Sequence, residues 1–196
     1  IQAEGADMGI VVDPDVDRLA FIDENGVLFG EEYTLVAIAD YVLKHKKGNT
    51  VSNLSSTRAL RDVTVKHGGE YFASAVGEVN VIEKMKAVNA VIGGEGNGGI
   101  IVPELHYGRD ALIGIALFLS HYAEVNMSLS ALKQTYPAYY MGKKKVDLDP
   151  SKPSDKILAA LTTKFAHENT NTIDGLKIDF PDYWVHLRRS NTEPII

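Results

Sequence analysis

The chain has 196 residues, of which 45% are hydrophobic and 23% are charged, and its formal net charge is −6 at neutral pH. This composition is that of a globular protein with enough apolar side chains for one large or two small domains. The negative charge argues against nucleic acid as a partner, because a phosphate backbone repels a protein without a basic stripe. The absence of cysteine excludes disulfides, thiolate zinc sites and a cysteine nucleophile, and it fits a cytoplasmic location.

The apolar stretches and the N-terminus of the chain indicate whether it spans a membrane and whether it is part of a longer protein. Apolar stretches such as 112–119 are too short to cross a bilayer, so we expect no membrane partner. No secretory signal is visible at the N-terminus. The sequence begins at Ile1 without a start methionine, and we therefore expect a fragment of a longer protein.

An acidic loop comes first along the chain. Asp13, Asp15 and Asp17 alternate between two apolar runs, and Arg18 follows at once. Neighbouring carboxylates raise one another's proton affinity, so a loop that keeps all three ionised needs a hard divalent cation. Arg18 adds a fixed positive charge that can bind a phosphate beside the metal. The spacing therefore predicts a cation site.

Two other interpretations of the acidic loop stay open. The DxDxD pattern also begins the calcium loop of an EF-hand, and Glu24 falls at the twelfth position of such a loop. Arg18, however, stands where that loop needs glycine, and the flanking runs are typical of strands, not of helices. The second alternative is an acidic surface turn that binds nothing.

From residue 32 onward, helix-like and strand-like segments alternate at short intervals. This alternation is typical of a layered α/β domain. The first helix is expected to end with Gly48 in the left-handed conformation, and Asp110 is the expected N-cap of the last one. The expected helices cover 32–47, 57–67, 79–86 and a segment after residue 110, and the expected strands cover 50–54, 71–75 and 90–92.

A glycine-rich loop, 94–99, follows the last of these strands and formally matches the GxGxxG fingerprint of a nucleotide-dependent oxidoreductase. That fingerprint needs a helix at the loop, whereas residues 100–103 are β-branched and end in proline. A turn that merely reverses the chain is another alternative. In the functional interpretation, the glycines leave Glu95 and Asn97 exposed to hydrogen-bond adjacent hydroxyls of a sugar.

The C-terminal part of the chain predicts a linker and a smaller α+β unit. The linker is indicated by a short helix, the basic run 143–145 and prolines. A helix over 154–168 is followed by expected strands over 172–180 and 184–187. The expected core of this unit is formed by Ile157, Leu158, Leu161, Phe165, Ile173, Ile178 and Trp184.

The last residues, 188–194, combine guanidinium groups, hydroxyls and turn-forming residues directly after a strand. Arg188 can bind two phosphate oxygens in a planar fork. Ser190, Asn191 and Thr192 offer further donors from a tight loop. The segment therefore predicts a phosphate site, and a solvated surface turn is an equally open alternative.

An acidic metal loop with its arginine, a glycine-rich loop and an Arg/Ser/Thr loop, in this order, resemble the α-D-phosphohexomutase family. The motifs are DPDVDR at 13–18, GEGNG at 94–98 and RRSNTEP at 188–194, and the resemblance covers the whole chain. The glycine loop looks most similar to that of the phosphoglucosamine mutases. The resemblance implies the end of domain two at 1–29, a three-layer α/β domain three at 30–125, a linker at 126–152 and a truncated α+β domain four at 153–196.

The resemblance also implies the chemistry of an isomerase that is an intramolecular phosphotransferase. Members move a phosphate between the 1- and 6-positions of a hexose through a phosphoserine and a bisphosphorylated sugar. Glucosamine phosphate is the first expectation for the sugar, and mannose or glucose phosphate is the alternative. The implied roles are Mg²⁺ ligation for Asp13, Asp15 and Asp17, catalytic contact with the phosphoryl group for Arg18, sugar binding for Glu95 and Asn97, and phosphate binding for Arg188, Ser190, Asn191 and Thr192.

No serine of this chain stands in the Ser-His-Asn-Pro setting of the phosphorylated residue of the family. We therefore expect the missing N-terminal phosphoserine domain of the same polypeptide as a partner, besides hexose phosphate and hexose 1,6-bisphosphate. By itself the chain is expected to be inactive and to bind Mg²⁺ weakly. A non-catalytic module that binds metal or sugar phosphate is the competing function.

Overall fold

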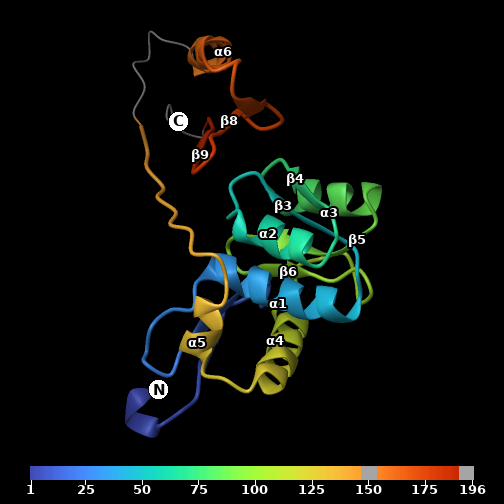
Figure 1. The fold of residues 1–196 in the computed structure, drawn as a ribbon, viewed down its shortest axis with the longest axis vertical. Helices are drawn as coiled ribbons and strands as arrows, with labels where there is room; N and C mark the ends of the chain where they lie inside the picture. Colours follow the sequence, from blue (N-terminus) through green and yellow to red (C-terminus); the bar gives the residue numbers. More distant parts are fainter. Residues whose placement is uncertain (147–153, 190–196) are drawn as a thin grey trace. The chain divides into compact units, whose positions relative to one another are not determined.

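The computed structural model describes residues 1–146 and 154–189. The chain divides into two compact units, Ile1–Tyr140 and Met141–Ile196, and each is described by itself (Figure 1). Within the described ranges, no helix is both long and apolar enough to cross a membrane.

A mixed four-stranded sheet forms the centre of the first unit. Its strand order is β4-β3-β5-β6, in which β3 is parallel to both β4 and β5 and β6 returns antiparallel to β5. Four of the five residues of β3 are buried, as expected for a central strand that is covered on both faces. The strands are β3 (Asn49–Asn53), β4 (Tyr71–Ser74), β5 (Ala90–Glu95) and β6 (Gly99–Ile101).

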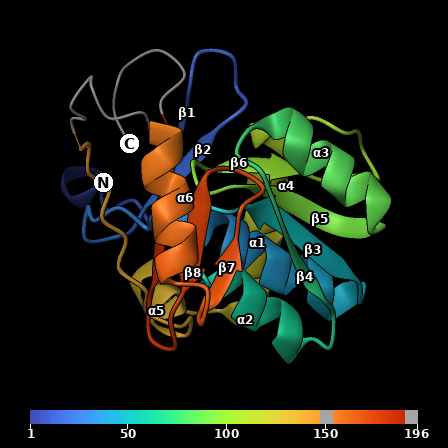
Figure 2. The same ribbon diagram turned by 90° about the horizontal axis from the view of Figure 1, so that it is seen from above.

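Helices cover both faces of this sheet, so the predicted α/β architecture is confirmed. Because β4 and β5 lie on either side of β3, right-handed crossovers place α2 and α3 on opposite faces. Figure 2 shows α3 on one side of the sheet and α1 and α2 on the other, and α1 also packs against α4. The helices are α1 (Glu31–His45), α2 (Ala59–Lys66), α3 (Glu78–Ala87) and α4 (Ala111–Val125).

An N-terminal hairpin packs into the core of the first unit. It follows a short 3-10 helix, η1 (Gln2–Glu4), and consists of β1 (Gly9–Val12) and β2 (Leu19–Ile22) in antiparallel pairing. Leu19 and Phe21 of β2 are almost fully buried, and the ring of Phe21 stacks on Phe118 of α4 at a centroid distance of 3.7 Å. This packing fixes β2, and with it the acidic loop, to the α/β unit.

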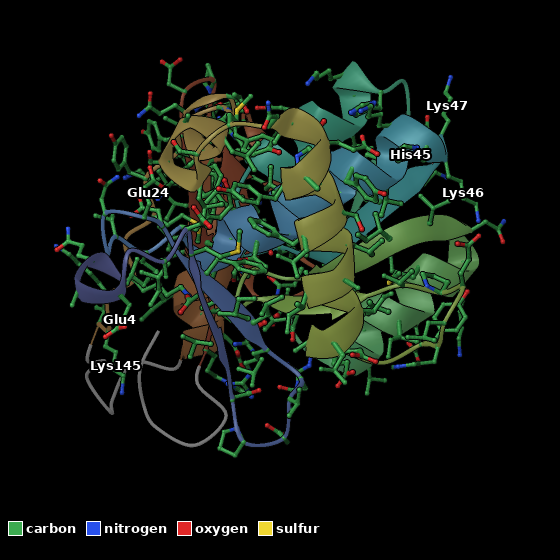
Figure 3. The ribbon with its side chains drawn as sticks, turned by 90° about the horizontal axis from the view of Figure 1, so that it is seen from below. Glu4, Glu24, His45, Lys46, Lys47 and Lys145 are labelled. Atoms are coloured by element: carbon green, nitrogen blue, oxygen red, sulfur yellow. The ribbon has the colours of Figure 1, made fainter. Side chains whose placement is uncertain are left out.

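A second contact joins the hairpin to α5 (Leu129–Gln134). The carboxylate of Glu24, labelled in Figure 3, accepts hydrogen bonds from the hydroxyl and from the backbone N–H of Ser130 at the N-terminal end of this helix. These donors stabilise the anion, and the Ser130 hydroxyl is the largest cause that lowers the pKa of Glu24 to about 2. A negative charge at this end of a helix is also favoured by the helix dipole.

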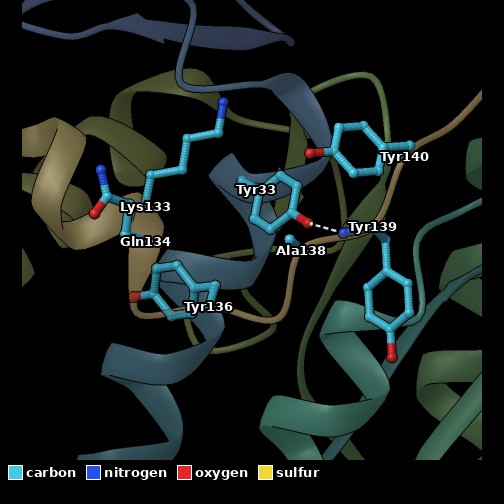
Figure 4. Close-up of a pocket in the computed structure, with 7 residues that line it drawn as sticks. All are labelled: Tyr33, Lys133, Gln134, Tyr136, Ala138, Tyr139 and Tyr140. Atoms are coloured by element: carbon cyan, nitrogen blue, oxygen red, sulfur yellow. Dashed lines mark hydrogen bonds between the residues drawn. The ribbon is translucent and has the colours of Figure 1, made fainter.

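The segment after α5 folds back onto α1. Figure 4 shows the hydroxyl of Tyr33 beside the backbone N–H of Tyr139, from which it accepts a hydrogen bond at 2.8 Å. The same hydroxyl donates to the carbonyl of Pro137 at 2.7 Å. The first unit therefore includes residues up to Tyr140. A cavity of about 450 Å³ here is lined by Tyr33, Lys133, Gln134, Tyr136, Ala138, Tyr139 and Tyr140.

The predicted left-handed end of α1 at Gly48 is wrong. The helix ends at His45, and Lys46 follows in an extended conformation, while His45, Lys46 and Lys47 lie together at this end of the helix (Figure 3). The glycine is instead needed for close packing. A Cβ at Gly48 would lie 2.4 Å from Cγ1 of Val91.

The second unit is the predicted α+β arrangement, with two corrections. Of the expected strand over 172–180, only Leu176–Asp179 forms a strand, because a turn with Gly175 at φ 76° separates it from an earlier strand, Asn169–Asn171. Ile173 lies in this turn and is 54% exposed, so it is not a core residue, whereas Leu176 and Ile178 are buried. The elements are α6 (Ser154–Lys164) and an antiparallel sheet of β7 (Asn169–Asn171), β8 (Leu176–Asp179) and β9 (Trp184–Leu187).

Replacing Ser130 with alanine should raise the pKa of Glu24 from about 2 toward its ordinary value of 4.5, because the hydroxyl donor is lost. A carboxyl group with a lowered pKa stabilises the fold above its unfolded-state pKa, and this stability is lost as the pH falls through its folded-state pKa. The variant should therefore lose less stability than the parent between pH 4.5 and 2. The measurement is a carbon-13 NMR titration of the Glu24 carboxyl.

Ser120→Ala is the matched control for this titration. The hydroxyl of Ser120 donates only to the carbonyl of Ala116 within its own helix, according to the described contacts. The Glu24 titration should be the same in this control as in the parent. An unchanged Glu24 titration in Ser130→Ala would contradict the assignment.

Candidate functional site

The acidic loop joins β1 to β2, and its first aspartate organises its backbone. Oδ1 of Asp13 accepts the backbone N–H groups of Asp17 and Arg18, at 3.1 and 3.0 Å. The loop also holds Val16 at a φ of 57°. A positive φ is rare for a β-branched residue, and such backbone conformations are concentrated at functional sites.

The structure brings the three predicted metal-binding carboxylates together. One side-chain oxygen from each of Asp13, Asp15 and Asp17 lies within 4.8 Å of the others. Oδ1 of Asp17 is buried and accepts no hydrogen bond from any described residue, and Nε of Arg18 lies 3.6 Å away from it. A buried anionic oxygen without a donor is unfavourable unless a cation binds it. The donor set therefore fits a hard divalent cation.

The pKa values of two of these aspartates are shifted in opposite directions. Burial is the largest cause that raises the pKa of Asp17, and the charges of Asp15 and Asp13 add to it while Arg109 opposes it. The pKa of Asp13 is lowered, chiefly by the hydrogen bond from the backbone N–H of Arg18. Without a metal, Asp13 therefore ionises more easily than an ordinary aspartate and Asp17 less easily. A cation beside Asp17 would favour its ionised form.

The EF-hand alternative is excluded by the structure. Two paired strands flank the acidic loop in place of the two helices that an EF-hand requires. Glu24, the expected twelfth-position ligand, hydrogen-bonds to Ser130. It does not belong to the carboxylate cluster found among the described residues.

The glycine-rich loop joins β5 to β6 and touches the end of the acidic loop. The carbonyl of Gly98 accepts the backbone N–H of Leu19 at 3.1 Å. Gly98 has a φ of 86°, and a Cβ there would lie 2.1 Å from the carbonyl oxygen of Leu19. Only glycine allows this approach. Because strand β6 follows the loop where a dinucleotide fingerprint needs a helix, the oxidoreductase alternative has no structural support.

The expectation that Glu95 is exposed is wrong, since only 5% of the residue is accessible. Its Oε1 accepts hydrogen bonds from the amide of Asn53 at 3.0 Å and from the backbone N–H of Gly77 at 3.2 Å. Its Oε2 accepts from Nη1 of Arg109 at 3.1 Å. Asn97 is partly exposed and accepts the N–H of Gly99 at 3.1 Å. Of the two predicted sugar-binding side chains, only Asn97 has substantial access to solvent.

Arg109 is a site residue that the sequence did not identify. Its side chain is only 14% exposed and forms an ion pair with Oδ2 of Asp17 in addition to its bond to Glu95. The backbone N–H of Arg109 donates to Glu78 at 2.9 Å, and Nε lies 3.5 Å from the same carboxylate. The only signal in the sequence is an arginine directly before the helix cap Asp110, at the start of an apolar helix.

The predicted phosphate-binding residues belong to the second unit. Arg188 follows β9, its side chain is 40% exposed, and Nε donates to Asp174 at 2.8 Å. A surface ion pair of this kind stabilises the fold by at most about 1 kcal/mol, so a phosphate can compete for the guanidinium. Ser190, Asn191 and Thr192 lie outside the described residues.

The site of the first unit lies where ligand sites of α/β proteins are expected. Asn53 and Glu95 stand at the carboxyl ends of β3 and β5, and Gly77 follows β4. In open α/β sheets, ligands bind outside the carboxyl ends of the strands. Fold and site together define a three-layer α/β protein with a candidate cation site at this edge of its sheet.

Comparison with known proteins extends this result. Residues 30–139 match the family model described as phosphoglucomutase/phosphomannomutase, alpha/beta/alpha domain III. A phosphoglucomutase/phosphomannomutase from Thermococcus kodakarensis is 34% identical over 100% of this chain and 43% of that protein. A probable phosphoglucosamine mutase from Methanopyrus kandleri is 31% identical over 100% of this chain and 44% of that protein.

Two solved structures illustrate the structural likeness. A phosphoglucomutase/phosphomannomutase family protein from Burkholderia thailandensis has a TM-score of 0.83 and 28% identity, over 99% of this chain and 42% of that one. An Aspergillus fumigatus N-acetylphosphoglucosamine mutase in complex with GlcNAc-6P and magnesium has a TM-score of 0.61 and 13% identity, over 95% of this chain and 46% of that one. The latter likeness concerns the fold alone.

The chain belongs to the phosphoglucomutase/phosphomannomutase family, as the motifs indicated. It spans 43% to 44% of the length of the two relatives described above. The activity of the whole protein is therefore a matter for proposal.

Replacing Gly98 with alanine should destabilise the first unit more than the same change at Gly26. Both glycines have a positive φ, which costs an alanine about 1 to 2 kcal/mol, but a Cβ at Gly26 has no neighbour within 4 Å. At Gly98 the clash with Leu19 should add about 1 to 3 kcal/mol. Urea unfolding followed by circular dichroism measures the difference. If both variants lose the same free energy of unfolding, the glycine loop does not pack closely against Leu19 of β2.

Proposed function

We propose that this chain is part of a phosphohexomutase that interconverts the 6-phosphate and 1-phosphate of a hexose. The observation that carries the proposal is the acidic cluster of Asp13, Asp15 and Asp17 beside the family's glycine loop, in which buried Oδ1 of Asp17 accepts no hydrogen bond from a described residue. In this role residues 1–29 are the end of domain two, 30–125 are domain three, 126–152 are the linker and 153–196 are part of domain four.

The acidic loop is proposed to hold Mg²⁺ through Asp13, Asp15 and Asp17. Carboxylate oxygens are the ligands that a hard divalent ion prefers. When bound, Mg²⁺ supplies positive charge that offsets the charge developing on a transferring phosphoryl group. Support comes from the donor set and from the magnesium in the complex of the Aspergillus protein of similar fold.

Arg18 is proposed to contact the transferring phosphoryl group as the catalytic arginine. Its side chain is 52% exposed, and its Nε lies 3.6 Å from both Asp13 and Asp17. The guanidinium is therefore held at the edge of the acidic cluster while part of it stays accessible. Such a placement allows a bidentate contact with phosphate oxygens next to the cation.

The sugar and the second phosphate are proposed to contact two other segments. Asn97 and Glu95 would bind sugar hydroxyls, with Asn97 the accessible side chain and Glu95 the buried one, whose oxygens already accept from Asn53, Gly77 and Arg109. Arg188, with Ser190, Asn191 and Thr192, would bind the phosphate that is not being transferred. A mutase needs this division, because its bisphosphorylated intermediate must bind in two orientations.

Glucosamine phosphate is the proposed sugar, with mannose or glucose phosphate as the alternative. The motif of the glycine loop and the names of several relatives support this order. The protein that contains this chain should convert glucosamine 6-phosphate faster than mannose or glucose 6-phosphate when the three are assayed side by side. No turnover with any of them would refute the proposal.

Asp15→Asn should weaken cation binding by the 196-residue chain about tenfold, which corresponds to about 1.4 kcal/mol for one lost anionic ligand. The measurement is the binding of Mn²⁺, followed by electron paramagnetic resonance. Asp7→Asn is the matched control, because Asp7 is an exposed carboxylate outside the cluster. If Asp15→Asn and Asp7→Asn bind Mn²⁺ equally well, the acidic loop is not the cation site.

Arg188→Ala, in the whole protein, should weaken the binding of a hexose 1,6-bisphosphate by about 1 to 3 kcal/mol, since a charged hydrogen bond is lost. Isothermal titration calorimetry measures the change. Arg61→Ala is the control, because this half-exposed arginine lies in the first unit and pairs with Asp62 on α2. The assignment of Arg188 is wrong if both variants bind the sugar like the parent.

A further inference from the structure

One guanidinium group joins three acidic residues that come from separate parts of the first unit. Nη2 of Arg109 pairs with Asp17 of the acidic loop, and Nη1 donates to Glu95 at the end of β5. Glu78, in the first turn of α3, accepts the backbone N–H of Arg109 and lies 3.5 Å from its Nε. Arg109 itself stands directly before α4. Four segments thus meet at a single side chain.

The charges at this point do not balance within the group. Three carboxylates share the guanidinium of Arg109, and in the described part of the chain only Asp17 among them also lies near a second one, with its Oδ1 3.6 Å from Nε of Arg18. The Arg109 side chain is 14% exposed and that of Glu95 is 7% exposed, so solvent screens these interactions less than at the surface. Any change in the charge that Asp17 presents to Arg109 must therefore alter the pairing of Arg109 with Glu95 and Glu78.

The pairing also orients Asp17. Oδ2 is bound to the guanidinium, which leaves Oδ1 as the buried oxygen without a hydrogen-bond donor beside Asp13 and Asp15. A planar guanidinium can hold two carboxylates at once through its two terminal nitrogens, whereas an ammonium group is a point charge without this geometry. The arrangement therefore depends on arginine and not only on positive charge.

We infer that Arg109 is a positioning residue that couples the acidic loop to the glycine loop. It orients Asp17 so that Oδ1 faces the cation. Through its second ion pair, it also makes the environment of Glu95 depend on whether the acidic loop holds a cation. When a cation binds Asp17, the ion pair between Asp17 and Arg109 weakens. The interaction between Arg109 and Glu95 then becomes stronger. The inference rests on the proposed cation site, and it adds a residue through which that site and the sugar-binding loop act as one.

The test is a Mg²⁺ titration of the 196-residue chain followed by amide NMR. The backbone N–H of Gly77 is the reporter, because it donates to Glu95 and belongs to neither the acidic loop nor the glycine loop. The amides of Asp13 and of residues 15–18 report occupation of the acidic loop itself, since Pro14 has no N–H. In the parent chain, the Gly77 resonance should shift with the same Mg²⁺ midpoint as those of Asp13 and residues 15–18.

Arg109→Lys keeps the positive charge but removes the planar fork. In this variant, the amides of Asp13 and residues 15–18 should still shift with Mg²⁺, whereas the shift of Gly77 should be lost. Arg61→Lys, whose half-exposed side chain pairs with Asp62 on α2, is the matched control and should behave like the parent. If Arg109→Lys does not fold, Glu95→Gln replaces it, because it removes the ion pair with Arg109 and should also abolish the Gly77 shift.

The outcomes separate the two proposals. No Mg²⁺-dependent shift at residues 13–18 in the parent would refute the cation site and with it the proposed function. Shifts at residues 13–18 without a shift at Gly77 in the parent would overturn the coupling alone. A Gly77 shift that persists in Arg109→Lys would also overturn the coupling, because the charge by itself would then suffice.

Discussion

Three carboxylates on alternate residues of one short loop repel one another, and the rest of the site depends on how this repulsion is offset. The protein supplies Arg18 and Arg109 and two backbone N–H groups that bind Asp13. These partners leave Oδ1 of Asp17 buried without a donor among the described residues. This oxygen carries negative charge that no described hydrogen-bond donor offsets, and it lies beside Asp13 and Asp15, where a divalent cation would complete the site.

The fold places the acidic loop at the edge of a sheet to which it does not itself belong. Strand β2 of the hairpin is fixed by buried Leu19 and Phe21, and the N–H of Leu19 bonds to Gly98 of the glycine loop. The glycine loop in turn continues β5, whose last residue Glu95 is held by Asn53 at the end of β3. Packing and backbone hydrogen bonds thus hold two loops together that are about eighty residues apart in sequence.

The sequence predicted the parts of this arrangement that local physics determines. Alternation of apolar segments gave the α/β class, Asp110 was recognised as a cap, and its side chain indeed accepts the N–H groups of Leu112 and Ile113. The acidic loop was recognised because its charges are adjacent in sequence. The prediction for Gly48 is wrong because this glycine packs against Val91 of the distant strand β5 and does not end the helix.

The burial of Glu95 and the role of Arg109 could not be predicted in this way. Both follow from the convergence of Asp17, Glu78 and Glu95, which are far apart in the chain and meet only through the tertiary fold. A glycine-rich loop suggests an exposed side chain, but here Glu95 is the last residue of a buried strand. Long-range ion pairs of this kind leave no periodic pattern in a sequence.

The central claim is that the acidic loop binds a divalent cation through all three aspartates. The most direct test is the anomalous scattering of crystals of this chain grown with Mn²⁺. The account predicts one peak bounded by carboxylate oxygens of Asp13, Asp15 and Asp17, with Asp17 contributing Oδ1 while Oδ2 stays on Arg109. A peak elsewhere, or a loop without manganese while the protein is saturated in solution, would contradict it.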